Sequence, residues 1–133
     1  MDKIITSGKR KTAVARAVLV EGSGKIRINN KDYKTLQTFN KLKIEEPIRI
    51  CENILGQTNF DVSISVKGGG EKSQIEAARL ALAKAIIKFA KSEELTKAFL
   101  DYDRNLLVAD IRRKEMYKPG DSKARKKRQT SYR

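Results

Sequence analysis

Apolar and polar residues alternate in two parts of the chain, and this two-residue period is typical of β-strands with one buried face. The clearer case is residues 60–67 (FDVSISVK), and a shorter one is residues 25–29 (KIRIN), where the isoleucines should face the core and the basic residues solvent. Residues 11–21 are rich in valine and alanine and are followed by a Gly-Ser-Gly turn at 22–24. Residues 11–21 and 25–29 therefore predict a β-hairpin.

A helical period of apolar residues is strongest after residue 72. Ser73 and Glu76 form a Ser-x-x-Glu capping box, so we expect a long helix from Ser73 to about Lys91. Its alanines permit close approach to a sheet. The stripe expected to face the core consists of Ile75, Ala78, Leu82, Ala85, Ile86 and Phe89. The pattern predicts that this is the main helix of the core.

Two shorter helices and one helical turn complete the predicted elements. Glu46 and Pro47 suit a first helical turn, because proline needs no hydrogen-bond partner there and a carboxylate suits the positive end of the helix dipole. Gly56 should end that helix, Ser92 should cap another, and residues 30–39 predict a short turn. The order strand, strand, helix, strand, helix, helix predicts an α+β fold, a small sheet with helices packed on one face.

The distribution of charge distinguishes a second region, the C-terminal segment. The 133-residue chain has a formal net charge of +14, and Arg112 to Arg133 hold ten basic and two acidic residues, a net +8. Such a segment buries too little apolar surface to offset the entropy of ordering it. Pro119-Gly120 favours an extended path over a long helix. We therefore divide the chain into a globular body, residues 1–111, and an extended basic C-terminal arm, residues 112–133.

The charge also limits the class of partner that the chain is expected to bind. A charge run alone is compatible with a solvated tail or a targeting signal. The body, with 20 basic and 14 acidic residues, is itself positive, which favours a nucleic acid over an anionic membrane. No apolar run approaches the roughly 20 residues that span a bilayer. Met1 leads into charged and polar residues and not into a secretory leader, so we expect a cytoplasmic protein.

The residue types argue against catalysis and cofactor binding. There is no histidine and Cys51 is the only cysteine, which excludes Ser-His and Cys-His pairs, a disulfide within the chain and a cysteine zinc site. The acids form no recognisable catalytic pair or metal cluster. Cys51 is interpreted as a small buried hydrophobe. We expect no enzymatic activity, no cofactor and no metal.

Residues 67–74 (KGGGEKSQ) join the clearest strand to the long helix through three glycines. The register differs from a P-loop, because Glu71 separates Gly70 from Lys72, and Ser73 stands where a dinucleotide motif has its third glycine. A structural turn is one remaining interpretation. The favoured one is close approach to an RNA phosphate, bound by the helix start and the two flanking lysines.

A second basic segment, residues 9–11, lies beside a glycine at the expected mouth of the hairpin. A solvated loop is the alternative, but Arg16 and the arm favour phosphate contact. The residues predicted to bind RNA are Lys9, Arg10, Lys11, Arg16, Lys67, Gly68, Gly69, Gly70, Lys72, Arg112, Arg113, Lys114, Lys118, Lys123, Arg125, Lys126 and Lys127.

Four segments together resemble the universal small-subunit ribosomal protein number nine family, bacterial S-nine and eukaryotic S-sixteen. They are GKRKTAVARA at 8–17, GKIRIN at 24–29, GGGEKSQIEAARLALAKAI at 68–86 and SKARKKRQTSYR at 122–133. The resemblance therefore covers the whole chain. The ending Tyr132-Arg133 and the pair Pro119-Gly120 are similar to the archaeal and eukaryotic branch, whereas Asp121-Ser122 replaces its more usual small residues.

This resemblance implies a structural, rRNA-bound protein in the head of the 30S or 40S subunit. It implies the fold of the second domain of ribosomal protein S-five, with a left-handed β-α-β crossover. It also implies that the arm reaches the anticodon stem-loop of P-site tRNA, where Arg133 contacts a tRNA phosphate with Arg128 nearby. The expected partners are small-subunit rRNA, P-site tRNA and neighbouring head proteins, but neither a membrane nor a second copy of the chain. The implied location is the cytoplasm, on the ribosome.

Two other functions remain to be separated from this one. A free RNA or DNA chaperone would use the arm to bind many polyanions alike. A nucleotide-dependent enzyme built on the glycine loop would lose its activity when Lys72 is replaced.

Overall fold

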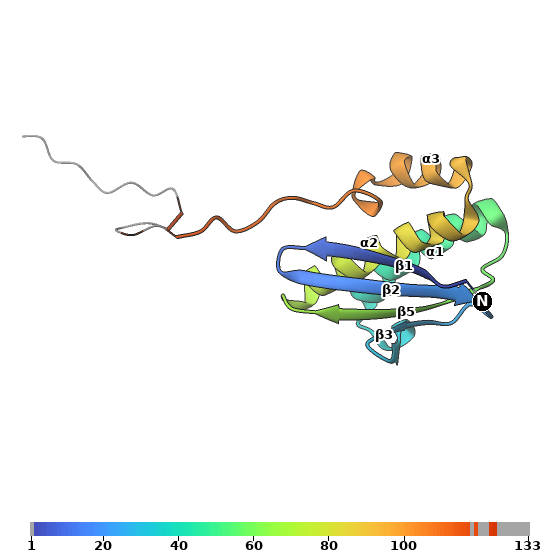
Figure 1. Ribbon diagram of the computed structural model, residues 1–133, viewed down its shortest axis with the longest axis horizontal. Helices are drawn as coiled ribbons and strands as arrows, with labels where there is room; N and C mark the ends of the chain where they lie inside the picture. The colour runs from blue at the N-terminus through green and yellow to red at the C-terminus, as the bar shows by residue number, and fades with distance from the viewer. Residues whose placement is uncertain (1, 118, 120–122, 125–133) are drawn as a thin grey trace, which may run out of the picture.

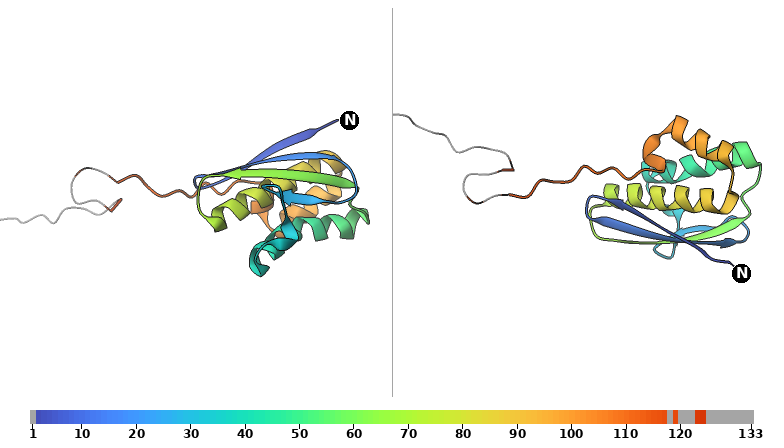
Figure 2. Two further views of the ribbon diagram at one scale, coloured as in Figure 1. Left: turned by 90° about the horizontal axis from the view of Figure 1, so that it is seen from below. Right: turned by 45° about the horizontal axis from the view of Figure 1, so that its top comes forward.

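The computed structural model describes residues 2–117, 119, 123 and 124 of the chain. The sheet is formed by β1 (Ile4–Arg10), β2 (Ala13–Glu21), β3 (Ile26–Ile28), β4 (Lys31–Asp32) and β5 (Phe60–Lys67), and the helices are α1 (Thr38–Leu55), α2 (Glu71–Ala90) and α3 (Glu93–Tyr102). The strand order is β1-β2-β5-β3-β4. The helices lie on one side of this sheet and leave its other face open (Figures 1 and 2). The predicted α+β class is confirmed.

The predicted hairpin between residues 11–21 and 25–29 is wrong, because β5 lies between β2 and β3. β2 pairs antiparallel with one edge of β5, and β3 runs parallel to the other. The Gly-Ser-Gly connection crosses the end of β5, where Asp61 Oδ1 accepts the backbone N–H groups of residues 23–25 at 2.9–3.0 Å. These hydrogen bonds lower the pKa of the Asp61 carboxyl, and the one from the backbone N–H of Lys25 has the largest effect. A distant carboxylate thus fixes a connection whose local sequence resembles a hairpin turn.

The hairpin partner of β2 is β1, which the sequence pattern did not predict. Its inward positions are held by Thr6 and Gly8, so the strand lacks apolar alternation. The Thr6 hydroxyl donates to the backbone carbonyl of Ala81 on α2 at 2.8 Å. A Cβ atom on Gly8 would lie 2.4 Å from the carbonyl oxygen of Ala77. The small inward residues therefore let β1 pack directly on the backbone of α2.

The first turns of α1 also differ from the prediction. The helix begins at Thr38, so the buried Pro47 lies inside it and not at its start. Phe39 and Leu42 remain exposed, and these turns therefore carry no buried stripe that the sequence pattern could detect. Gly56, with φ of 76°, ends the helix as expected.

The predicted start of the long helix is two residues too late. α2 begins at Glu71 with Gly70 as its N-cap, so the capping box at Ser73 is not formed. The Gln74 side-chain amide instead donates to the carbonyl oxygen of Gly68 at 3.1 Å, which ties the first turn of the helix back to the loop. The predicted alanine-rich face and the end of the helix near Lys91 are both confirmed.

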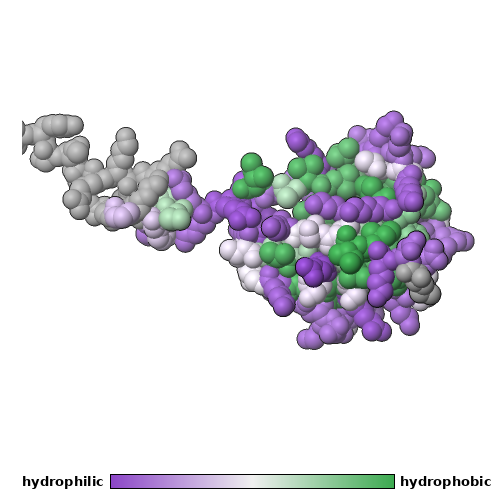
Figure 3. All heavy atoms as spheres, viewed as in Figure 1, coloured by the Kyte–Doolittle hydropathy of each residue, from purple (hydrophilic) through white to green (hydrophobic). Residues whose placement is uncertain are grey.

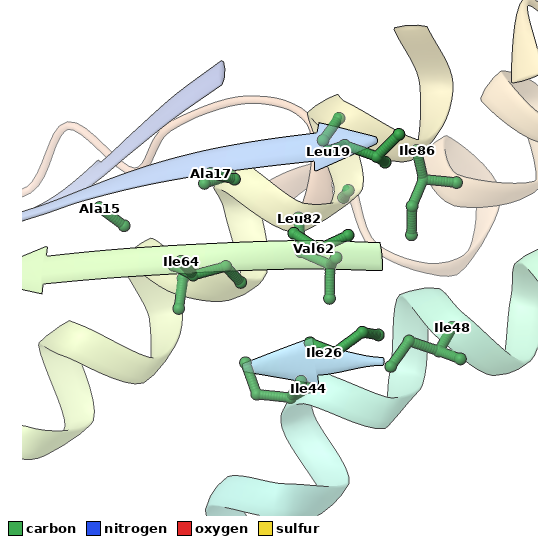
Figure 4. Close-up of a cluster of buried hydrophobic side chains, with 14 of the residues drawn as sticks. Ala15, Ala17, Leu19, Ile26, Ile44, Ile48, Val62, Ile64, Leu82 and Ile86 are labelled. Atoms are coloured by element: carbon green, nitrogen blue, oxygen red, sulfur yellow. The ribbon is translucent and has the colours of Figure 1, made fainter. Parts of the chain in front are cut away.

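The core fills the space between the sheet and the helices. Side chains from β2, β3 and β5 meet those of α1 and α2 there; those labelled in Figure 4 are Ala15, Ala17, Leu19, Ile26, Ile44, Ile48, Val62, Ile64, Leu82 and Ile86. Cys51 is fully buried, and this burial raises its pKa to about 11, so the thiol is neutral near pH 7. The interpretation of Cys51 as a core residue is confirmed.

α3 packs mainly on α1 and joins the body to the arm. The Ser92 hydroxyl accepts the Leu95 N–H at 3.4 Å, as predicted for an N-cap, and Leu106 is fully buried in the following 3-10 turn. Residues 111–117 are exposed and outside regular secondary structure. Within the ranges that the structure describes, no helix has the length and apolar character needed to cross a bilayer.

Candidate nucleic-acid interface

The predicted basic segment and the glycine loop lie at the same end of the molecule. Val14, just after the β1–β2 turn, pairs with Lys67 at the end of β5. A Cβ atom on Gly68 would lie 2.7 Å from the carbonyl oxygen of Thr12, so the glycine loop touches the hairpin turn directly. The exposed lysines of these segments form a cluster that we call the basic end: Lys9, Lys11, Lys67 and Lys72. The arm leaves the body from the same end (Figure 1).

The three glycines of the loop have different roles. Gly68 and Gly69 adopt left-handed backbone conformations, with φ of 78° and 69°. A Cβ atom on Gly69 would lie 3.0 Å from both the Cβ and the backbone nitrogen of Ala13. Gly70 has φ of −89° and open space where its Cβ would be. A structural turn thus accounts for Gly68 and Gly69, while Gly70 leaves the start of α2 accessible to a ligand.

Arg10 is engaged inside the protein, unlike the lysines beside it. Its side chain is 13% exposed, and its Nε donates to Glu76 Oε2 on α2 at 2.6 Å. Its Nη1 lies 3.4 Å from Asp110 Oδ2 and donates to the carbonyl oxygen of Arg112 at 3.2 Å. Arg10 therefore joins β1, α2 and the start of the arm. The sequence suggested only its positive charge, not this role in holding the arm.

Asp110 fixes the first residues of the arm. Its carboxylate accepts the backbone N–H of Arg112 at 3.0 Å and the Nη2 of the same residue at 2.7 Å. These bonds from Arg112 hold the pKa of the Asp110 carboxyl far below its usual value. The exposed Lys114 follows, with its Nζ 4.7 Å from the centre of the Tyr117 ring. The arm thus starts from a defined position on the body.

An open hollow of about 810 Å³ lies between the hairpin turn and the arm. Basic side chains dominate its lining, which consists of Arg10, Lys11, Thr12, Arg112, Arg113 and Lys114. None of the described residues that line it is an acid. Arg10 and Arg112 are paired with Asp110, so Lys11, Arg113 and Lys114 supply the uncompensated positive charge where the two predicted basic regions meet. Such a site attracts the phosphates of a nucleic acid.

A neighbouring cluster of charges is internally compensated. Arg79, with a side chain 12% exposed, forms ion pairs with Glu46 on α1 and with Asp103 after α3. The arginine thereby links all three helices. Because its charge is matched by two carboxylates, this cluster is a poor site for an anion.

The remaining predicted residues lie apart from the basic end or beyond the described residues. Arg16 is exposed on the open face of the sheet, between Ser7 and Ser65 on the adjacent strands. Lys123 is exposed. Residues outside the described ranges include Lys118, Arg125, Lys126, Lys127, Arg128 and Arg133. No group of three potential metal ligands occurs among the residues that the structure describes.

Comparison with known sequences identifies relatives along the full chain. A sequence model of the family described as ribosomal protein S9/S16 matches residues 8–133. The small ribosomal subunit protein uS9 of Methanococcus vannielii is 51% identical over 136 residues, which cover 100% of both chains. The proteins of the same name from Thermoplasma volcanium and Methanothrix thermoacetophila are 46% and 42% identical over 134 residues, again covering 100% of both chains.

Proposed function

The chain belongs to the ribosomal protein S9/S16 family, in its archaeal-type branch, and we propose that it binds rRNA in the head of the small ribosomal subunit. As a member of this family it is a structural constituent of the ribosome and not an enzyme. One observation carries the rRNA proposal: exposed cations from the β1–β2 turn, the glycine loop and the first residues of the arm meet at one end of the body.

The basic end is suited to phosphate, and the one exposed acid in the first turn of α2, Glu71, accepts a hydrogen bond from Asn40 Nδ2 at 2.8 Å. Lys9, Lys11, Lys67 and Lys72 form no ion pair with any carboxylate in the described part of the chain. A phosphate approaching Gly70 would also meet the positive end of the α2 dipole. We propose that Lys9, Lys11, Lys67 and Lys72 bind rRNA here, with Gly70 at the helix start, and that the predicted basic residues of the arm bind it further along. Arg10 instead holds the arm to the body through Glu76 and Asp110.

For the arm, we propose the function implied by the resemblance. Residues 1–111 act as the body, and residues 112–133 extend through rRNA to the anticodon stem-loop of P-site tRNA. Arg133 contacts a tRNA phosphate, and Arg128 lies nearby. The +8 charge of residues 112–133 supports this proposal, because an arm of this charge binds polyanions strongly. Neighbouring proteins of the subunit head are further partners, whereas a membrane and a second copy of the chain are not partners. The protein resides on ribosomes in the cytoplasm.

We also propose that the fold is that of the second domain of ribosomal protein S-five, with a left-handed crossover. The parallel neighbours β3 and β5, which are connected through α1, support this proposal. An experimental structure of the subunit tests the handedness. A right-handed path from β3 to β5 would contradict the proposal.

Sedimentation of cell lysate tests the ribosomal assignment. On sucrose gradients we expect the chain to sediment with small subunits in a one-to-one ratio and to remain there through a high-salt wash, because many phosphate contacts act together. Recovery mainly in free fractions would instead favour an RNA chaperone. Robust nucleotide hydrolysis that depends on Lys72 would contradict both the ribosomal assignment and the RNA chaperone.

Replacing Arg133 with alanine is expected to leave subunit assembly intact and to weaken P-site tRNA retention by about 5- to 150-fold, the range for a charged hydrogen bond of about 1 to 3 kcal/mol. The measurement is the tRNA dissociation rate from purified subunits. Arg133→Lys is the matched control. Its tRNA dissociation rate should lie between those of the wild type and of Arg133→Ala, because lysine keeps the charge but loses the planar donor pair. A failure of assembly would instead assign Arg133 a structural role.

A further inference from the structure

The face of the sheet opposite the helices is uncovered and carries a coherent set of side chains. Strand pairing places these residues in three rows across the sheet: Lys9, Val14 and Lys67; Ser7, Arg16 and Ser65; and Ile5, Val18, Ser63 and Arg27. We call this surface the open face. In the view of Figure 3, apolar patches lie among hydrophilic side chains on this side of the body. We propose that the open face docks on a base-paired segment of RNA by its ribose-phosphate backbone.

Charge complementarity is the first argument for RNA. The four cations of the open face form no ion pair with a carboxylate among the described residues. Two acids lie at its margin. Asp61 uses its Oδ1 for three backbone N–H groups, and Asp32, opposite Arg27, accepts the backbone N–H of Lys34 at 3.1 Å. The exposed cations therefore outnumber the acids, which already accept hydrogen bonds within the protein.

The spacing and type of the side chains give the second argument. Strands in a sheet lie ~4.8 Å apart, so Arg16 on β2 and Arg27 on β3, separated by β5, are on the order of 10 Å from each other. Ser63 and Ser65 lie on β5 between them and present exposed hydroxyls. Cations with hydroxyls between them match a surface of phosphates and ribose 2′-hydroxyls.

The absence of aromatic side chains separates paired from unpaired RNA. Sheets that bind single strands stack bases on exposed aromatic rings. The three rows of the open face contain no aromatic residue but have aliphatic side chains, among them Ile5, Val14 and Val18. These side chains can pack on ribose C–H groups but not stack on bases. A double-helical segment, whose wide and shallow minor groove presents the ribose edges, is therefore the occupant that fits.

This inference rests on the proposed function, because it takes the RNA to be rRNA, but it concerns a surface separate from the hollow at the arm. Of its ten residues, only Lys9, Arg16 and Lys67 were among those predicted to bind RNA, and Lys9 and Lys67 also belong to the basic end. Arg27 was assigned to the charged side of its strand, and the register with β5 is what brings it into line with Ser63.

The test uses the full-length chain and a transcript of small-subunit rRNA. The variant is Arg16→Gln with Arg27→Gln, and the control is Lys34→Gln with Lys97→Gln, which removes the same charge from exposed positions off the open face. We expect the variant to bind at least 10-fold more weakly than the control and to flatten the slope of log K against log salt by about two units, one per lost phosphate contact. Equal thermal melting temperatures would confirm that both variants fold.

Hydroxyl-radical footprinting identifies the RNA segment that binds the open face. The variant should lose ribose protection along one base-paired segment and keep the protections made by the arm. Loss confined to unpaired nucleotides would overturn the inference, as would a footprint identical to wild type. Unchanged rRNA binding with weakened incorporation of a neighbouring protein would assign the face to a protein partner. Failure of the wild-type chain to bind the transcript would instead count against the proposed function itself.

Discussion

Replacing Gly8 with alanine is expected to destabilise the fold by about 3 kcal/mol, as overpacking of a tight core contact does. The new Cβ would lie 2.4 Å from the carbonyl oxygen of Ala77 and 2.8 Å from the backbone nitrogen of Ala81. Both atoms belong to the backbone of α2, which cannot turn aside as a flexible side chain does. Because small domains are stable by only about 5 to 15 kcal/mol, the loss is a large fraction of the total.

Urea unfolding of the full-length chain measures this loss. The matched control is Gly70→Ala, because a Cβ there meets no atom within 4 Å and φ is −89°. The control should cost about 1 kcal/mol or less, the effect of alanine at a helix N-cap. Equal losses at Gly8 and Gly70 would mean that β1 does not pack on α2 as described.

Elements with a regular apolar pattern were predicted well, and elements defined by distant contacts were not. The strand Phe60–Lys67 follows from its alternation, and the alanine-rich face of α2 follows from its helical period. β1 has Thr6 and Gly8 at its inward positions, so its burial depends on α2, more than 60 residues later in the chain. No local pattern encodes such a partner.

The false hairpin has the same origin. Residues 22–24 have a typical turn composition, but β3 pairs with β5 and not with β2. The hydrogen bonds from that connection to Asp61 join residues 36 to 38 positions apart. A carboxylate within an alternating strand appears as an ordinary solvent-facing residue in the sequence. Its function in fixing the connection becomes visible only once the strand order is known.

The candidate interface divides along similar lines. Lys11 was predicted from its charge and Lys67 from its place beside the glycine loop, and both side chains are exposed. Arg10 has the same charge but contacts Glu76 and Asp110, 66 and 100 residues away in the sequence. Composition therefore predicts where positive charge is available, whereas folding decides which cations are used inside the protein.

The dense basic cluster of the arm is expected to dominate the affinity for rRNA. Replacing Lys123, Arg125, Lys126 and Lys127 with glutamine removes four positive charges. If each contacts one rRNA phosphate, the slope of log K against log salt should fall by about 3.6, which corresponds to roughly a 10³-fold weaker affinity at 0.15 M salt. Filter binding of the full-length variant to small-subunit rRNA across a salt series measures both quantities.

A charge-matched variant distinguishes a specific arm from general electrostatic attraction. The substitutions Lys31→Gln, Lys34→Gln, Lys88→Gln and Lys97→Gln remove four exposed charges from the body and leave the arm intact. Because these lysines lie outside the basic end and the hollow, they should change the slope by about one unit or less, through long-range attraction alone. If both variants lost the same affinity, net charge and not the position of the arm would govern binding, and the arm would be a solvated tail.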